Sequence, residues 1–211
     1  MILFGLSANP PTGLGGHAGL VRWAADQARL DEWGGEGADE VWILPVYRHA
    51  FTAKRHMAPF EDRVAMARLA FEQLAGLEGR VRVLRLEKHV YESLKSAGAP
   101  DSTPNVGTID VIDHLEQTVP GCRFALLLGA DTYRDLLEGK WRRSDELLRR
   151  VVIIAVARKG VSVEVPVRSD APMLDEISSS AIRRDFSAWA HTLQPEVRRY
   201  IETHGLYLSP D

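Results

Sequence analysis

A chain of 211 residues is long enough for one well-buried domain and short for two independent cores, so we expect a single domain over residues 1–211. Hydrophobic residues make up 45% and charged residues 26% of the chain, a balance that excludes a mainly disordered protein. The net charge of -3 excludes long nucleic acid as the expected partner, and the single Cys122 excludes an internal disulfide and a cysteine metal cluster.

The chain opens with a short apolar run at residues 1–6, which is typical of a buried strand. Asn9 and two prolines then predict a loop, and apolar residues at helical spacing predict a helix over residues 17–30. The run is too short for a membrane span and lacks the basic start of a secretion signal, so we expect a cytoplasmic protein without a membrane partner.

The same order of strand, loop and helix repeats along the chain. The apolar patterns predict further strands at 41–44, 81–84, 124–128 and 151–157, helices at 59–77 and 106–119, and a long loop at 87–105. Fully apolar strands alternating with helices indicate an α/β fold with a doubly wound parallel sheet. Ligands bind beyond the carboxyl ends of such strands, which places residues 7–17, 45–54, 129–141 and the segment from Ile177 on one rim.

The first loop has the composition of a phosphate-binding turn. Glycines let backbone amides at a helix start approach a polyphosphate closely, and residues 13, 15 and 16 are glycines. His17 could donate to phosphate oxygens as charge builds up in an in-line displacement. Thr12 could bind a phosphate or serve only as a turn residue.

This loop resembles the (T/H)-x-G-H signature of the nucleotidylyltransferase superfamily, which shares a fold core with class I aminoacyl-tRNA synthetases. Gly16 and His17 match its second half, and Thr12 takes the first position if two residues are inserted between them. The resemblance implies that the loop binds the phosphates of ATP. We therefore assign Ser7, Asn9, Thr12, Gly16 and His17 to a predicted ATP site, with His17 as a catalytic residue.

A second motif, residues 177–184, combines three serines at a helix start with arginine on the next turn. Such a segment forms either an anion pocket or an ordinary capped helix. It resembles the ISSTxIR motif of the same superfamily, with Ser180 in place of threonine. The resemblance implies that Ser178, Ser179, Ser180 and Arg183 bind the ATP triphosphate, with Arg183 catalytic.

Gly129 and Asp131 follow the fourth predicted strand, and Trp141 lies ten residues beyond Asp131. A carboxylate there can accept hydrogen bonds from ribose hydroxyls, and a tryptophan can stack on a flat ring or anchor a helix by packing. These residues resemble the GxD and tryptophan of the nicotinate and nicotinamide mononucleotide adenylyltransferases. The resemblance implies that Gly129 and Asp131 meet the adenosine side and Trp141 the pyridine ring.

The loop after the second strand and the helix that follows it also resemble that family. The resemblance places Lys54 on the active rim, beside the mononucleotide, as a catalytic charge. Tyr47 is a candidate contact to the mononucleotide, and the favoured alternative is packing within the loop. Arg63 could orient a loop, bind phosphate or form a helix salt bridge. Thr103 and Thr108 resemble the threonines that touch the mononucleotide, and both also suit helix caps.

The resemblance runs from residue 1 to residue 207 and implies a Rossmann-like nucleotidylyltransferase fold with a small helical C-terminal part, approximately residues 175–211. We expect an adenylyltransferase of NAD biosynthesis that joins ATP, with Mg²⁺, to nicotinate or nicotinamide mononucleotide. Selection between the two depends on loop amides and dipoles that the sequence does not display; we expect nicotinate mononucleotide to be accepted, and no protein metal site is expected. The alternatives are a pantetheine-phosphate or other small-substrate adenylyl- or cytidylyltransferase, and a nucleotide sensor without turnover. The rim after the fourth strand is a candidate interface for a homo-oligomer.

Overall fold

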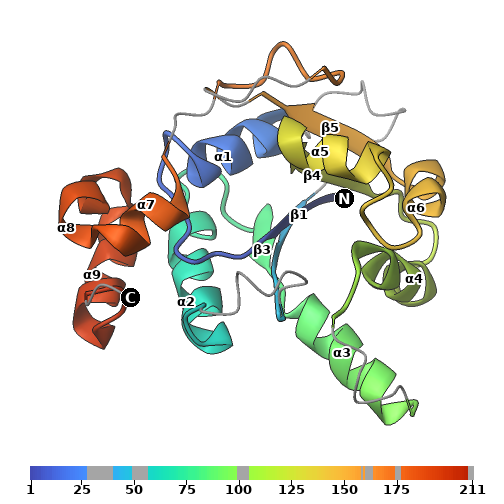
Figure 1. Cartoon of the computed structure of the whole chain (residues 1–211), viewed down its shortest axis with the longest axis horizontal. Helices are drawn as coiled ribbons and strands as arrows, with labels where there is room; N and C mark the ends of the chain where they lie inside the picture. The colour runs from blue at the N-terminus through green and yellow to red at the C-terminus, as the bar shows by residue number, and fades with distance from the viewer. Residues whose placement is uncertain are drawn as a thin grey trace.

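The computed structural model describes residues 1–27, 40–48, 57–98, 105–157, 159, 164–173 and 177–208. Within these residues one parallel sheet runs in the order β3-β2-β1-β4-β5 (Figure 1). Its strands are β1 (Ile2–Leu6), β2 (Val41–Pro45), β3 (Val81–Val83), β4 (Ala125–Gly129) and β5 (Val152–Val156). The order confirms the predicted doubly wound α/β sheet.

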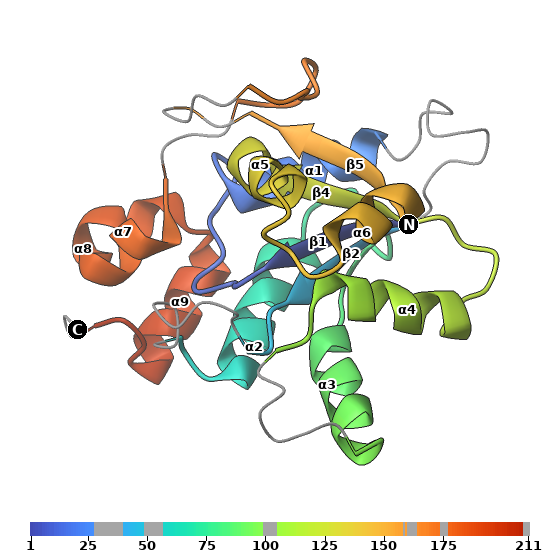
Figure 2. The same cartoon turned by 45° about the vertical axis from the view of Figure 1, so that its right-hand side comes forward.

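Helices connect the strands and extend beyond the last one. The connecting helices are α1 (His17–Gln27), α2 (Phe60–Phe71), α3 (Leu86–Ser96), α4 (Thr108–Thr118), α5 (Ala130–Leu137) and α6 (Ser144–Arg150). The C-terminal part holds α7 (Ser179–Arg184), α8 (Phe186–Trp189), the 3-10 helix η3 (Ala190–Thr192) and α9 (Pro195–His204). These last helices gather beside α2, away from β5, in both views (Figures 1 and 2).

Alternating side chains of the strands form two buried clusters, one on each face of the sheet. Phe4 and Leu6 of β1 share one cluster with α1, α2 and the C-terminal helices, to which Val197 of α9 contributes. Leu3 points to the other face, where it joins Leu136 of α5 and residues of α4 and α6. Both faces of the sheet are covered, which explains why the strands are apolar without alternation.

One predicted element is wrong. The predicted loop over residues 87–105 contains a helix, α3, that runs to Ser96. Its apolar stripe is thin, since Val90 is its one fully buried residue and charged side chains surround Leu86 and Leu94. Leu86, Val90 and Leu94 nevertheless recur every four residues, the spacing of one helix face, so the sequence carries the helical pattern that the loop prediction missed.

The strands separate at the centre of the sheet. Residues of β1 pair with β2 along all five positions, whereas β1 pairs with β4 only at Ile2↔Ala125 and Leu3↔Leu126. Gly5 is exposed although β1 is the central strand, and a Cβ built on it would meet nothing within 4 Å. Gly5 lies on the same face of the sheet as Leu3, the face covered by α4 and α5, so the opening is on that face. The strand order reverses at this point, and parallel sheets of this kind bind ligands where the order reverses.

Candidate nucleotide-binding site

His17 is held in the first loop by Thr12, which is almost fully buried. The Thr12 hydroxyl accepts the His17 backbone N–H at 2.8 Å and lies 2.9 Å from Nδ1 of the ring. The Thr12 backbone N–H donates to the same Nδ1 at 3.1 Å. A nitrogen that accepts a backbone N–H carries no proton in the neutral ring, so the ring proton lies on Nε2. Thr12 thus orients the histidine and selects its tautomer.

The glycines of the loop make this arrangement possible. A Cβ on Gly16 would overlap the Thr12 hydroxyl oxygen, so only glycine lets Thr12 reach the start of α1. A Cβ on Gly13 would come within 2.5 Å of the Thr192 carbonyl oxygen, which accepts the Gly13 N–H at 3.0 Å. The loop is therefore closely packed on itself and on the C-terminal part.

Asn9 connects the first loop to two distant segments. Its side-chain oxygen accepts the Ala58 N–H at 3.0 Å and the Tyr207 hydroxyl at 2.6 Å. Its backbone carbonyl accepts a hydrogen bond from Arg183 at 2.7 Å. With 2% of its surface exposed, Asn9 fixes the shape of the loop.

The serine motif lies against this loop. Ser178 caps α7 by accepting the Ala181 N–H at 3.1 Å, and Ser179 donates to the Pro10 carbonyl at 2.7 Å. Besides its bond to Asn9, Arg183 donates to the Ser180 hydroxyl at 3.2 Å. The structure thus brings the two predicted ATP motifs together from opposite ends of the chain.

Arg63 is buried beneath the ends of β1 and β2. Its guanidinium donates to the carbonyl oxygens of Ala58 at 2.9 Å, Ser7 at 2.9 Å and Val46 at 2.6 Å. Burial lowers the pKa of the Arg63 guanidinium. Of the roles considered for this residue, loop orientation is the one these bonds support.

Gly129 and Asp131 follow β4, the neighbour of β1 in the sheet. Gly129 ends β4 in extended conformation and precedes α5, and Asp131 lies half-buried in the first turn of that helix. A Cβ on Gly129 would lie 2.7 Å from a carboxylate oxygen of Asp131. Glycine therefore lets this carboxylate sit directly against the end of the strand.

The residues predicted for the mononucleotide are only partly within the described chain. Tyr47 packs edge-on against Phe60, with ring centroids 5.0 Å apart. Thr108 is the first residue of α4, and Trp141 is half-buried against the cluster on the same face. Lys54 and Thr103 lie outside the described residues.

Two residues of this region escaped the sequence analysis. Glu87 accepts the Tyr47 N–H at 2.9 Å, and burial raises the pKa of its carboxyl from 4.5 to about 7, against the effects of that bond and of Arg63. The hydroxyl of Tyr207, near the other end of the chain, donates to the side-chain oxygen of Asn9. No local pattern marks either contact, because Glu87 lies 40 positions from Tyr47, in the first turn of the misassigned α3, and Tyr207 lies 198 positions from Asn9.

The described residues contain no cluster of three His, Cys, Asp or Glu side chains suited to a metal ion. A hollow of about 350 Å³ between α2 and α9, lined by residues such as Glu61, Arg85 and Tyr200, includes none of the predicted site residues. Within the same part of the chain, every helix is too short or too polar to span a membrane.

Comparison with known proteins decides the family. A family model described as cytidylyltransferase-like matches residues 7–185. A relative from Anaeromyxobacter dehalogenans, named "Probable nicotinate-nucleotide adenylyltransferase", is 38% identical over 176 residues, 82% of each chain. The chain belongs to the nicotinate-nucleotide adenylyltransferase family. It is therefore a nucleotidyltransferase, and the resemblance read from its motifs is confirmed.

Further members of the nicotinate-nucleotide adenylyltransferase family match almost end to end. The protein of that name from Bacillus subtilis is 27% identical over 213 residues, covering 98% of this chain and 97% of the relative. The solved structure of Plasmodium falciparum nicotinic acid mononucleotide adenylyltransferase complexed with NaAD has a TM-score of 0.66 at 16% identity, covering 98% of this chain and 96% of that one. That likeness supports the fold.

Proposed function

We propose that this chain transfers AMP from ATP to nicotinate mononucleotide, forming nicotinate adenine dinucleotide and pyrophosphate. The observation that carries the proposal is the contact between the two ATP motifs, in which Arg183 and Ser179 bond the loop that orients His17. This constellation borders the opening at the centre of the sheet. The names of the relatives supply the pyridine substrate.

In the proposed reaction a phosphate oxygen of the mononucleotide attacks the α-phosphorus of ATP. The bond between that phosphorus and the bridging oxygen of the β-phosphate breaks, and pyrophosphate leaves with the electron pair. The attacking phosphate is already ionised at neutral pH, so neither a protein nucleophile nor a general base is required. Positioning and stabilisation of charge then account for catalysis.

Each charge-stabilising group has a specific task. The Nε2 proton of His17 is donated in a hydrogen bond to a phosphate oxygen of ATP, and Arg183 and Lys54 supply positive charge to the departing pyrophosphate. ATP enters as its magnesium complex, the ion being held largely by phosphate oxygens and water. Ser178, Ser179 and Ser180 complete the phosphate pocket.

In this proposal the adenosine half and the pyridine half of the dinucleotide product contact different residues. Gly129 and Asp131 meet the adenosine ribose, and Ser7, Asn9, Thr12 and Gly16 shape the loop around the phosphates. Tyr47, Thr103, Thr108 and Trp141 surround the mononucleotide, with the Trp141 indole stacked on the pyridine ring. We place the reaction in the cytoplasm, where ATP is supplied. We also propose that the rim after β4 is the interface of a homo-oligomer.

Pyrophosphate release tests the proposal directly. ATP and magnesium are incubated with nicotinate mononucleotide, nicotinamide mononucleotide or phosphopantetheine in separate reactions, beside a His17→Ala control. We expect release with nicotinate mononucleotide and its loss in the control. Release only with phosphopantetheine would assign a different acceptor, and ATP binding without release in any reaction would support the nucleotide sensor.

A further inference from the structure

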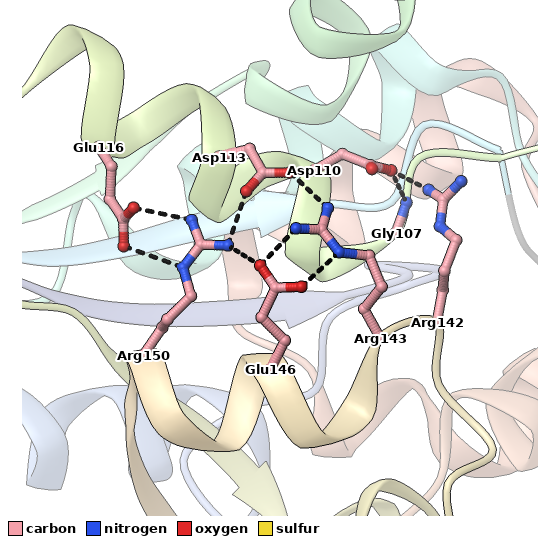
Figure 3. Close-up of polar contacts among 8 residues, drawn as sticks. All are labelled: Gly107, Asp110, Asp113, Glu116, Arg142, Arg143, Glu146 and Arg150. Atoms are coloured by element: carbon pink, nitrogen blue, oxygen red, sulfur yellow. Dashed lines mark hydrogen bonds and ion pairs between the residues drawn. The ribbon is translucent and has the colours of Figure 1, made fainter.

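Asp110 ties two segments of the predicted mononucleotide pocket together. It lies in the first turn of α4, where its Oδ2 accepts the backbone N–H of Gly107, the residue that caps the helix, at 2.8 Å. The same oxygen accepts a hydrogen bond from the guanidinium of Arg142, the residue directly after Trp141 (Figure 3). One carboxylate thus joins the start of α4 to the Trp141 segment.

Arg142 also lies close against the backbone at the start of α4. A Cβ built on Gly107 would come within 3.0 Å of Nη2 and 3.2 Å of Nε of Arg142. The Asp110 side chain is only 16% exposed and that of Arg142 is 48% exposed. The pair therefore sits at the edge of the packed region, with its carboxylate mostly covered and its guanidinium about half exposed.

The residues after Arg142 hold the same segment rigidly. Arg143 adopts a left-handed backbone conformation, with φ of 54°, which is costly for a residue other than glycine. Its guanidinium compensates by pairing with Asp113 of α4 at 2.7 Å and with Glu146 at 2.7 Å (Figure 3). The buried Ser144 donates its hydroxyl to the Trp141 carbonyl at 2.7 Å.

Arg150 belongs to the same network but lies at the other end of α6. It pairs with Asp113, Glu116 and Glu146 at 2.7 Å each, and so joins α6 to α4 (Figure 3). It shares Asp113 and Glu146 with Arg143, but within the described part of the chain no hydrogen bond or ion pair joins it to Trp141 or Arg142. This gives the network an internal control. Arg142 and Arg150 each bridge to α4, but only Arg142 is adjacent to Trp141.

We propose that the Asp110–Arg142 ion pair is a positioning pair that holds Trp141 and the first turn of α4 in register for stacking on the pyridine ring. The inference rests on the proposed function, in which Trp141 and Thr108 contact the mononucleotide. Neither Asp110 nor Arg142 takes part in the chemical step. Loss of the pair should therefore weaken mononucleotide binding and leave ATP binding and turnover intact.

Steady-state kinetics of Asp110→Asn, Arg142→Gln and the double variant test the pair. Asparagine keeps an acceptor for the Gly107 N–H and removes the charge. We expect each single variant to raise KM for nicotinate mononucleotide about three- to fivefold, the scale of one exposed ion pair, with kcat and the KM for ATP within about twofold of the wild type. The double variant should be no worse than either single one, because the two side chains act as one unit.

Two further variants separate positioning from general stabilisation. Arg150→Gln should lower the melting temperature at least as much as Arg142→Gln while leaving every KM unchanged. Arg142→Lys, which keeps the charge, should restore part of the affinity. Equal KM values for Arg142→Gln and Arg150→Gln, or additive effects in the double variant, would overturn the positioning role.

Fluorescence of Trp141 gives a readout independent of turnover. Its emission is taken as the difference between the wild type and Trp141→Phe, since the chain has five tryptophans. Nicotinate mononucleotide should quench this emission in the wild type and Arg150→Gln, and should need a severalfold higher concentration in Arg142→Gln. Half-maximal quenching at the same nicotinate mononucleotide concentration in all three proteins would refute the positioning role of the pair and leave the proposed function standing. A wild type that shows neither turnover nor quenching would refute the proposed function and the inference with it.

Discussion

The hydroxyl of Thr12 lies 2.9 Å from Nδ1 of His17 and accepts the backbone N–H of the same histidine at 2.8 Å. One buried side chain therefore fixes the ring and the first residue of α1, and the backbone N–H of the same threonine fixes the tautomer. Thr12 is accordingly a residue that positions His17, in addition to the phosphate contact expected from the motif. The two inserted residues between Thr12 and Gly16 do not prevent this contact.

Removal of the Thr12 hydroxyl should lower turnover without unfolding the loop. Thr12→Val keeps the shape of the side chain, and the Thr12 N–H bond to Nδ1 can persist, so we expect kcat to fall about tenfold. His17→Ala, which removes the donor itself, should cost roughly a hundred- to a thousandfold. Pyrophosphate release measures both. Thr12→Ser is the matched control, and a Thr12→Val enzyme as fast as Thr12→Ser would contradict the role.

Tyr207 should affect ATP binding through Asn9. Tyr207→Phe removes the hydroxyl that donates to the Asn9 side chain at 2.6 Å, whereas Tyr200→Phe removes one that donates to Asp62 of α2 at 2.8 Å. Each should lower the free energy of unfolding by about 1 kcal/mol in urea titrations. Only Tyr207→Phe should also raise KM for ATP. An equal KM in the two variants would show that the Asn9 contact serves stability alone.

Glu87 predicts a pH dependence of stability. Burial raises the pKa of this carboxyl from 4.5 to about 7, so the folded protein keeps a proton that the unfolded chain loses. Glu87 thus stabilises the fold most below pH 4.5, and this contribution falls as the pH rises to about 7. The loss of stability per pH unit is limited to one proton, about 1.4 kcal/mol.

Glu87→Gln isolates this effect. Glutamine can still accept the Tyr47 N–H but cannot ionise, so the variant should gain stability relative to the wild type as pH rises from 4.5 to about 7. Urea unfolding at several pH values measures the difference. Glu92→Gln on the exposed side of α3 is the control, and parallel stability curves for wild type and Glu87→Gln would contradict the prediction.

The sequence predicted the strands and motifs that are formed by residues close together in the chain. The uninterrupted apolar residues of β4 predicted a strand buried on both faces, and Gly16 with His17 predicted a phosphate loop at the end of β1. These features depend on neighbouring residues. The order of the motifs placed both ATP segments on one rim, and the structure brings them into contact.

Contacts between distant segments could not be predicted. Tyr207 and Asn9 are 198 positions apart, and no local pattern links them. The sequence left three roles open for Arg63, and only the fold shows that the ends of β1 and β2 bury it among backbone carbonyls. Arg142 carried no signal because it lies in the turn before α6 and its partner Asp110, on α4, is 32 positions away.

Gly5 offers a test of where the nucleotide lies. A side chain at this position meets nothing within 4 Å in the free protein, so Gly5→Ala should fold normally and gain about 0.4–1 kcal/mol from the smaller entropy of its unfolded chain. The same methyl group would intrude on the opening between the first loop and Asp131. We therefore expect stability and ATP affinity to change in opposite directions.

Gly5→Val should enlarge this effect, because its side chain fills more of the opening. We expect KM for ATP to rise modestly in Gly5→Ala and about tenfold in Gly5→Val, as expected for an overpacked site. Thermal unfolding and initial rates, measured on the same samples, separate misfolding from obstruction. If Gly5→Val folds and keeps the wild-type KM for ATP, the nucleotide does not cross β1, and the proposed ATP site would have to move toward α7.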